Sequence, residues 1–217
     1  SFSSYVRNES DLRQAEWQKV QGRFVDLAFQ EPFEQLLRLV GNAIRTEFPP
    51  DLHERLLGQI KWIRSAPSWG EVRERFAVGT LLPACLPLEP TTALVLGPLF
   101  RSKLAQNERS LLSFLVSDEP RGFQDFVRSA DWSKEPAPLF GLDDLYDYVA
   151  SSLGPTAYQG ELARRWIEIE NAISRVQADA PPRTRDVVKA VGHLSRYGGD
   201  VGLEASEDAL SHAVGDH

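Results

Sequence analysis

The sequence comprises 217 residues with a formal net charge of −7, and 42% of its residues are hydrophobic and 25% charged. This balance is typical of a globular chain long enough for one large domain or two small ones, and it excludes an intrinsically disordered protein. The sequence has no apolar run of about 18 residues and no signal-peptide pattern, so we expect a cytoplasmic protein without membrane contact. The net acidity argues against a dominant nucleic-acid-binding role, because phosphate contacts require clustered Lys and Arg.

Cysteine and histidine usage indicates neither a disulfide nor a metal site. The single cysteine, Cys85, has the apolar neighbours Leu81, Leu82 and Leu86, which favour a small buried hydrophobe over a reactive thiol. The four histidines lack the paired spacing of a zinc or metalloprotease site; they are His53, His193, His212 and His217. We therefore predict that the chain holds no metal.

The first 30 residues are predicted to contain one helix and one short strand. The helix spans residues 11–21, and the strand spans residues 23–29, where apolar and polar positions alternate incompletely. Another helix then begins at Glu31-Pro32, because proline at the first helical position loses no hydrogen bond. Its apolar stripe has helical spacing and consists of Phe33, Leu36, Leu37, Val40 and Ile44.

Residues 31–129 are predicted to form a helical bundle. Residues 80–90 are apolar and rich in proline, which predicts a buried irregular crossing before a helix over residues 91–104. Asn107 is a good N-cap for the next helix, whose apolar stripe is Leu111, Leu112 and Leu115. A short helix that begins at Glu119-Pro120 completes the bundle.

The composition changes at residues 130–140, which we predict to be a linker, so that residues 141–217 form a second helical domain. In that domain a heptad-like seam runs through Leu162, Trp166, Ile169, Ile173 and Val176, and intramolecular packing is its simplest explanation. A helix, a glycine turn at residues 198–202 and a last helix capped by Ser206 give a helix-turn-helix outline. The last helix and its approach carry four carboxylates and no Lys or Arg, so we expect no binding to duplex DNA.

One stretch resembles a known nucleotide-sensing element. The sequence Gln106-Asn107-Glu108-Arg109-Ser110-Leu111-Leu112 is similar to the sensor-2 element of AAA+ and STAND-type P-loop ATPases. In those proteins an arginine that opens a lid helix reaches the terminal phosphates of the nucleotide. The resemblance implies that Asn107 and Arg109 bind ATP in this way. The alternative is that Arg109 makes an ordinary surface ion pair.

A second stretch resembles the same family. Gly22-Arg23-Phe24, followed by Pro32-Phe33-Glu34-Gln35-Leu36-Leu37, looks like the point where the last strand of an ATPase core leaves for the lid. On this resemblance Arg23 is an arginine finger directed at a neighbouring subunit of a homo-oligomer, and a strand-edge arginine is the plainer alternative. Large bacterial P-loop ATPases of the phage-defence kind contain segments similar to Gln-Asn-Glu-Arg-Ser-Leu and Leu-x-Asp-Leu-Tyr-Asp-Tyr in this sequence. The order of domains in this family implies that residues 1–30 form the end of the ATPase core, residues 31–129 a lid-like helical bundle and residues 141–217 a winged-helix-like domain.

The nucleotide-binding motifs themselves are absent from the sequence. It has no Gly-x-x-x-x-Gly-Lys-Ser/Thr loop and no hydrophobic strand ending in Asp-Glu, so we do not expect this chain alone to hydrolyse ATP. Because the sequence also lacks methionine, we expect an excised piece of a longer protein whose upstream half binds ATP and Mg²⁺. The alternative hypothesis is a stand-alone helical module that binds protein partners without nucleotide chemistry.

Overall fold

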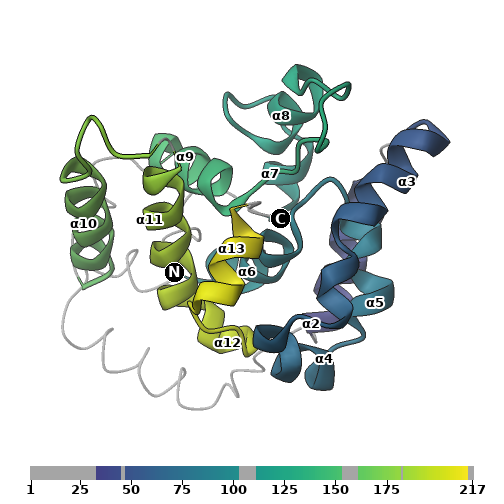
Figure 1. Ribbon diagram of the computed structural model, residues 1–217, viewed down its shortest axis with the longest axis horizontal. Coiled ribbons are helices and arrows are strands. Elements are labelled where there is room, and N and C mark those ends of the chain that lie inside the picture. Colours follow the sequence, from purple (N-terminus) through teal and green to yellow (C-terminus); the bar gives the residue numbers. More distant parts are fainter. Residues whose placement is uncertain (1–32, 45–46, 103–110, 153–160, 182, 215–217) are drawn as a thin grey trace, which may run out of the picture. The chain divides into compact units, whose positions relative to one another are not determined.

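The computed structural model (Figure 1) describes residues 33–44, 47–102, 111–152, 161–181 and 183–214. Two compact units, Ser1–Glu31 and Pro32–His217, make up the chain, and only the second contains described residues. The predicted mainly α fold class is confirmed, because every regular element among the described residues is a helix. The predicted strand at residues 23–29 lies outside them.

The α-helices, in chain order, are α2 (Phe33–Ala43), α3 (Pro50–Gln59), α4 (Gly70–Arg75), α5 (Val78–Leu81), α6 (Pro90–Arg101), α7 (Leu111–Val116), α8 (Phe123–Ser129), α9 (Leu142–Ser152), α10 (Glu161–Ser174), α11 (Thr184–His193), α12 (Gly199–Val201) and α13 (Glu207–Ala213). Short 3₁₀ turns connect the first of them: η2 (Lys61–Arg64), η3 (Pro67–Trp69) and η4 (Pro83–Cys85). A π-helical turn, η6 (Leu194–Gly198), joins α11 to α12.

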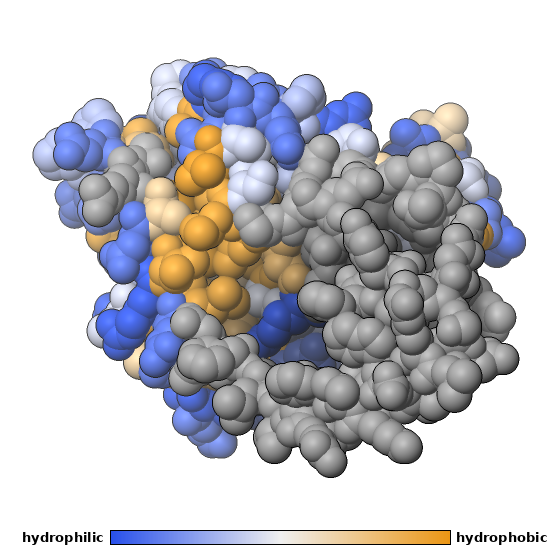
Figure 2. All heavy atoms as spheres, turned by 180° about the vertical axis from the view of Figure 1, so that it is seen from behind, coloured by the Kyte–Doolittle hydropathy of each residue, from blue (hydrophilic) through white to orange (hydrophobic). Residues whose placement is uncertain are grey.

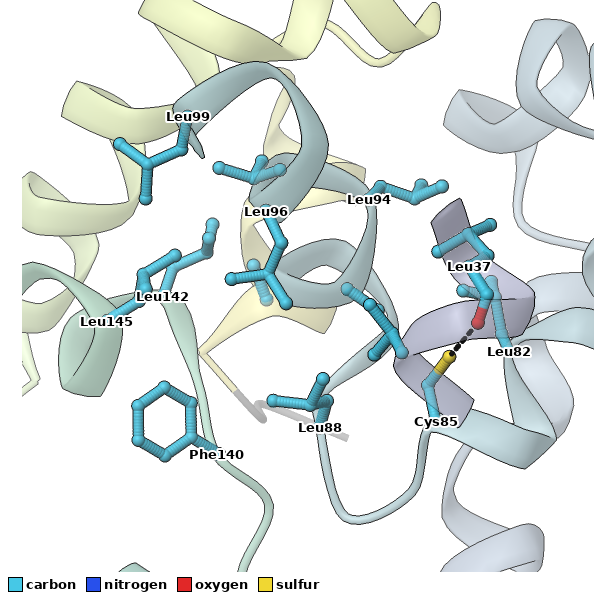
Figure 3. Close-up of a cluster of buried hydrophobic side chains, with 14 of the residues drawn as sticks. Leu37, Leu82, Cys85, Leu88, Leu94, Leu96, Leu99, Phe140, Leu142 and Leu145 are labelled. Atoms are coloured by element: carbon cyan, nitrogen blue, oxygen red, sulfur yellow. Dashed lines mark hydrogen bonds between the residues drawn. The ribbon is translucent and has the colours of Figure 1, made fainter. Parts of the chain in front are cut away.

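Helix α6 lies at the centre of the hydrophobic core. Ten consecutive residues from Pro90 to Leu99 are buried, as expected of a helix that is apolar on all sides. Figure 3 shows Leu94 pointing toward Leu37 of α2, while Leu99 and Leu96 point toward Leu142 and Leu145 at the start of α9. The helix therefore connects the core of the first half of the chain to that of the second.

Helix α2 has the apolar stripe that the sequence predicted. Leu37 and Val40 are fully buried, and Ile44, just beyond the helix, is buried as well. The close approach of α2 to α6 depends on a glycine, because a Cβ atom on Gly97 would lie 2.7 Å from Leu36 and 2.8 Å from Phe33. The absence of a side chain at position 97 thus lets these two helices pack at short range.

The segment 130–140, which we expected to be a linker, is part of the core. Ala137 and Phe140 are almost fully buried. Phe140 donates a backbone hydrogen bond to Pro87 and accepts one from Glu89, and it forms an isolated parallel bridge with Leu88. Its ring packs against Phe114, Phe123 and Phe126. Residues on both sides of the expected boundary therefore belong to one compact unit, Pro32–His217.

Helix α10 packs against α11, so the heptad-like seam is used within the chain. Trp166 is buried, and Ile169 and Ile173 pack on the core. A Cβ atom at Gly192 of α11 would lie 2.7 Å from the end of the Ile169 side chain. Gly192 thus makes room for the Ile169 side chain where α10 packs against α11.

The end of the chain only partly follows the predicted helix-turn-helix outline. Ser206 caps α13 as expected, its hydroxyl accepting a hydrogen bond from the Ala209 amide. The predicted glycine turn at residues 198–202 was wrong, since the chain stays helical to Val201 and reverses at Gly202, where φ is 77°. At Gly198 a Cβ atom would lie 2.0 Å from the Leu203 carbonyl oxygen, so no side chain fits. Residues 183–214 contain no strand, so the wing of a winged helix is not seen there.

Cys85 is buried, as the sequence predicted. Its Sγ donates to the carbonyl oxygen of Leu37 at 3.6 Å (Figure 3) and to that of Leu81 at 3.4 Å. Burial raises the pKa of this thiol to about 12, so it stays protonated and unreactive at neutral pH. The helices of the described ranges are all too short or too polar to span a lipid bilayer.

Candidate functional site

The predicted arginine finger, Arg23, and the residues predicted to bind nucleotide, Asn107 and Arg109, lie outside the described residues, so their roles stay predictions. The structure does describe the helix that follows the second motif. In α7, Leu111 and Leu115 are buried as predicted, but Leu112 is 46% exposed and Phe114 is fully buried in its place. The predicted stripe was therefore wrong at one position, because positions 111, 114 and 115 share a face of a helix and position 112 does not.

A pocket of about 460 Å³ is the most distinctive candidate site in the described part of the chain. It lies where the N-terminal ends of α6 and α9 meet the segment 134–141, the end of α3 and the helix α13, which packs against α6 (Figure 1). Its polar lining is dominated by carboxylates from separate elements: Glu89, Glu135, Asp143, Asp144 and Asp186. Segments distant in the sequence therefore bring like charges together.

Glu89 is held in place as the N-cap of α6. One carboxylate oxygen accepts a hydrogen bond from the Thr92 amide at 2.9 Å, and the other accepts one from the Thr91 hydroxyl at 3.0 Å. The Thr92 amide lies in the first turn of α6, where backbone amides have no acceptor within the helix, so a side-chain acceptor is favoured at the N-cap position of Glu89. Burial raises the pKa of Glu89 to about 7, against the lowering effect of the hydrogen bonds. The side chain is thus a structural cap that also lines the pocket.

Asp143 and Asp144 occupy the first turn of α9. Asp144 reaches back to accept a hydrogen bond from the Gly141 amide at 3.0 Å, the geometry of half a capping box. Burial, and then the charge of Asp143, raise the pKa of Asp144 to about 7. Burial, and then the charge of Asp186, raise the pKa of Asp143. A Cβ atom at Gly141 would lie 2.5 Å from an Asp143 carboxylate oxygen, so this glycine makes room for the carboxylate.

Three of the cations in or near the pocket, Lys189, Arg183 and Arg55, have identified partners. Lys189 forms an ion pair with Asp147 at 2.8 Å, and Arg183 donates to the carbonyl oxygen of Val214 at 2.7 Å. Arg55 pairs with Glu135 at 2.6 Å. Within the residues that the structure describes, no ion pair neutralises the remaining carboxylates, Glu89, Asp143, Asp144 and Asp186. The lining thus holds five carboxylates against two basic side chains, Lys134 and Arg183, and the nearby Lys189 lowers the pKa of Asp143 and of Asp144.

Two stacked aromatic rings also line the pocket. His212 of α13 stacks on Trp62 of η2, with ring centroids 4.0 Å apart and an interplanar angle of 4°. The edge of Trp62 meets Trp69 at 5.0 Å, which fixes the stack in the core. Arg55 of α3 binds the carbonyl oxygens of Trp132 and Lys134, so it anchors the segment that closes the third side of the pocket.

Charge and geometry limit the chemistry of this pocket. Carboxylates repel anions, so the pocket does not suit a nucleotide phosphate. Among the described residues, no group of three or more His, Cys, Asp or Glu side chains is arranged to hold a metal ion. A lining in which carboxylates outnumber basic side chains favours ligands that bring positive charge and hydrogen-bond donors.

Comparisons of the chain with protein-family models, with curated proteins and with solved structures found no match.

The pocket was not predicted from the sequence, because its carboxylates come from four separate stretches of the chain. Two of them were readable as helix starts: Glu89 precedes Pro90, and Asp144 follows Gly141 at capping-box spacing. Neither pattern predicts that the N-terminal ends of α6 and α9 lie close together, because this contact depends on the burial of Phe140 between them.

Proposed function

We propose that this chain is a non-catalytic helical part of a P-loop ATPase that couples ATP binding and hydrolysis to conformational change and partner contact. The proposal starts from the ordered pair of motifs around Arg23 and Arg109, which resemble the lid entry and the sensor-2 element of AAA+ and STAND-type ATPases. ATP and Mg²⁺ would bind to an upstream nucleotide-binding domain. In this role the chain itself hydrolyses nothing, and neighbouring subunits of a homo-oligomer are its natural partners.

The observation that carries the proposal is the contact between the helices that follow the two motifs. Helix α2 follows the first motif, helix α7 follows the second, and the two helices pack against each other within the unit Pro32–His217. Phe33 and Leu36 of α2 also pack closely on α6. A lid that responds to nucleotide needs such a link, because the contact lets the helix at the sensor arginine transmit force to the rest of the bundle.

An arginine substitution in the full-length protein tests the proposal. We expect Arg109→Ala to lower ATP turnover about 10²-fold, because the guanidinium would stabilise charge that develops in the transition state. Arg64→Ala is the matched control, since Arg64 is exposed on η2 and its loss should leave turnover unchanged. Unchanged turnover in Arg109→Ala, with unchanged thermal stability, would contradict the assignment. So would a reading frame around this chain that encodes no phosphate-binding loop.

The second candidate is a stand-alone helical module that binds proteins without nucleotide chemistry. It is favoured by exposed large hydrophobic side chains on the contacting helices α2 and α7: Leu39 is 39% exposed, Leu112 46% and Val116 62%. Figure 2 shows hydrophobic residues gathered on one face of the molecule. Apolar surface of this kind often marks a contact with another protein. Purified full-length protein that neither binds nor hydrolyses ATP would favour this candidate over the first.

A further inference from the structure

We propose that His193 is a pH-sensitive switch for helix α10: the neutral imidazole lets α10 pack against α9 and α11, and protonation of the imidazole releases α10. The proposal goes beyond the two candidate functions and depends on neither of them. It rests on the place of the imidazole in the fold, on a buried nitrogen atom without a hydrogen-bond partner and on the way in which α10 is attached.

Helix α10 is attached to the rest of the unit through few side chains. Among the described elements, α11 is the one against which it packs most closely, and Figure 1 shows the two helices side by side. Trp166 of α10 stacks on Tyr146 of α9, with ring centroids 4.7 Å apart, and Ile169 fills the space above Gly192. Glu170 accepts a hydrogen bond from the Tyr146 hydroxyl at 2.6 Å. All three contacts lie within little more than one turn of the helix.

His193 lies where these contacts meet. It is 1% exposed, and its imidazole lies beside the rings of Tyr146, Trp166 and Tyr197, at centroid distances of 5.9, 6.3 and 6.1 Å. The Nε2 atom of His193 and the Nε1 atom of Trp166 are buried without a hydrogen-bond partner in the described part of the chain. His193 also ends α11, where the helix changes to the π-helical turn η6, a rare geometry that is frequent at functional sites. The imidazole therefore packs as an apolar group between α9, α10 and η6.

Protonation would place a charge where the fold does not compensate it. A protonated imidazole donates from both ring nitrogens, and the described residues offer no acceptor to Nε2. Cation–π attraction is small at centroid distances of about 6 Å, so it does not offset the loss of hydration. Burial alone lowers the pKa of His193 from its ordinary value of 6.5 to about 4. Release of α10 is the least disruptive way to bring the charge to water, because α9 and η6 also pack against the central helix α6.

The charged and titratable groups around His193 already have partners. They are Tyr146 and Asp147 of α9, Glu170 of α10, Lys189 of α11, Arg196 and Tyr197 of η6, and Asp208 and His212 of α13. Glu170 binds the Tyr146 hydroxyl, Lys189 pairs with Asp147, Arg196 lies over the Tyr197 ring, and Asp208 accepts from Ser68 and pairs with His212. None of these described groups contributes to the pKa of His193, which burial lowers.

The sign of the pH dependence follows from the lowered pKa. Packing of α10 is fully favoured above pH 6.5 and is weakened as the pH falls toward 4. From pH 7.5 to pH 5.5 the ratio of released to packed α10 should rise about tenfold, because His193 takes up a proton over this range only when α10 is released. Glu89 and Asp144 also take up protons over this range, with the opposite effect on stability, because their pKa values are raised to about 7. A substitution of His193 alone isolates its contribution.

Hydrogen–deuterium exchange of the complete 217-residue chain, measured by mass spectrometry at pH 7.5 and pH 5.5, tests the proposal. Protection factors, corrected for the pH dependence of intrinsic amide exchange, report how often each helix opens. We expect the protection of α10 to fall about tenfold at pH 5.5 relative to that of α2, because α2 does not contact His193 and stays packed. Equal changes in α10 and α2, or no change in α10, would overturn the proposal without any variant.

Variants assign the response to one imidazole. His193→Phe keeps a planar ring in the cluster and His193→Gln keeps a polar group, and neither can be protonated, so each should abolish the response of α10 to acid. His53→Gln removes an exposed histidine of α3 and should retain the response. Thermal unfolding of each variant at pH 7.5 reports whether it is folded. A folded His193 variant that keeps the wild-type response would contradict the proposal, and so would loss of the response in His53→Gln.

Discussion

The body of helix α6 and its N-terminal end differ in how the polar groups around them are satisfied. Along its length the helix is surrounded by apolar side chains, and Leu94 and Leu96 are fully buried. At its N-terminal end, Glu89 is 4% exposed and faces a pocket in which Asp143, Asp144 and Asp186 form no ion pair among the described residues. The close apolar packing along the helix is explained by its contribution to stability alone. The N-terminal end opposes folding, because buried like charges raise the free energy of the folded state. This contrast is the reason to look for function at the pocket and for structure along the helix.

The largest expected effect lies on the apolar side of the comparison. Phe114 of α7 is fully buried and packs against Phe100, Phe123, Phe140 and Tyr148. We expect Phe114→Ala to lower the free energy of unfolding by about 4 kcal/mol, as large-to-small core substitutions do. Leu112→Ala in the same helix is the control and should cost well under half as much, because Leu112 is 46% exposed. Urea denaturation measures both. Equal losses would mean that the assigned faces of α7 are incorrect.

A smaller effect of opposite sign is expected at the pocket. The folded-state pKa of Asp144, about 7, lies above its ordinary value of 3.8. The stability associated with this carboxyl is therefore fully present below pH 3.8 and is lost as pH rises through about 7. Asp144→Asn should stabilise the chain at pH 8 by about 2 kcal/mol, a value reduced for partial solvent access, and by much less at pH 4. The asparagine oxygen can still accept the hydrogen bond from Gly141.

Urea denaturation at the two pH values gives this difference directly. Asp179→Asn serves as the control, because this carboxylate is exposed and should show no comparable dependence on pH. A destabilised Asp144→Asn at pH 8 would mean that the capping interaction of Asp144 outweighs its repulsion from Asp143. The comparison between core and pocket would then fail at this residue.

The sequence predicted the apolar side of this comparison better than the charged side. The α2 stripe and the burial of Cys85 followed from local patterns, since helical spacing and apolar neighbours report burial directly. Residues 130–140 were misread because a segment rich in proline and polar residues looks like a linker, although Phe140 packs between two helix ends. Residues 198–202 were misread because glycines usually end helices, whereas Gly198 is needed for the close approach of Leu203.

The pocket could not be predicted for a related reason. Glu89 and Asp144 each satisfy a local rule for a helix start. Their juxtaposition depends on long-range contacts of Phe140 with Pro87 and Glu89, which no periodicity encodes. The motifs around Arg23 and Arg109 pose the opposite problem, since they can be recognised in the sequence but their arginines lie outside the described residues.

The most direct test of this account is the titration of the pocket carboxyl groups by ¹³C NMR in the uniformly labelled chain, with Glu89→Gln and Asp144→Asn used to assign the signals. We expect the Glu89 and Asp144 carboxyl resonances to titrate with pKa values of about 7, because burial disfavours their ionised forms. Titration of both groups near pH 4 would contradict the claim that the pocket holds buried carboxyl groups whose pKa values are raised.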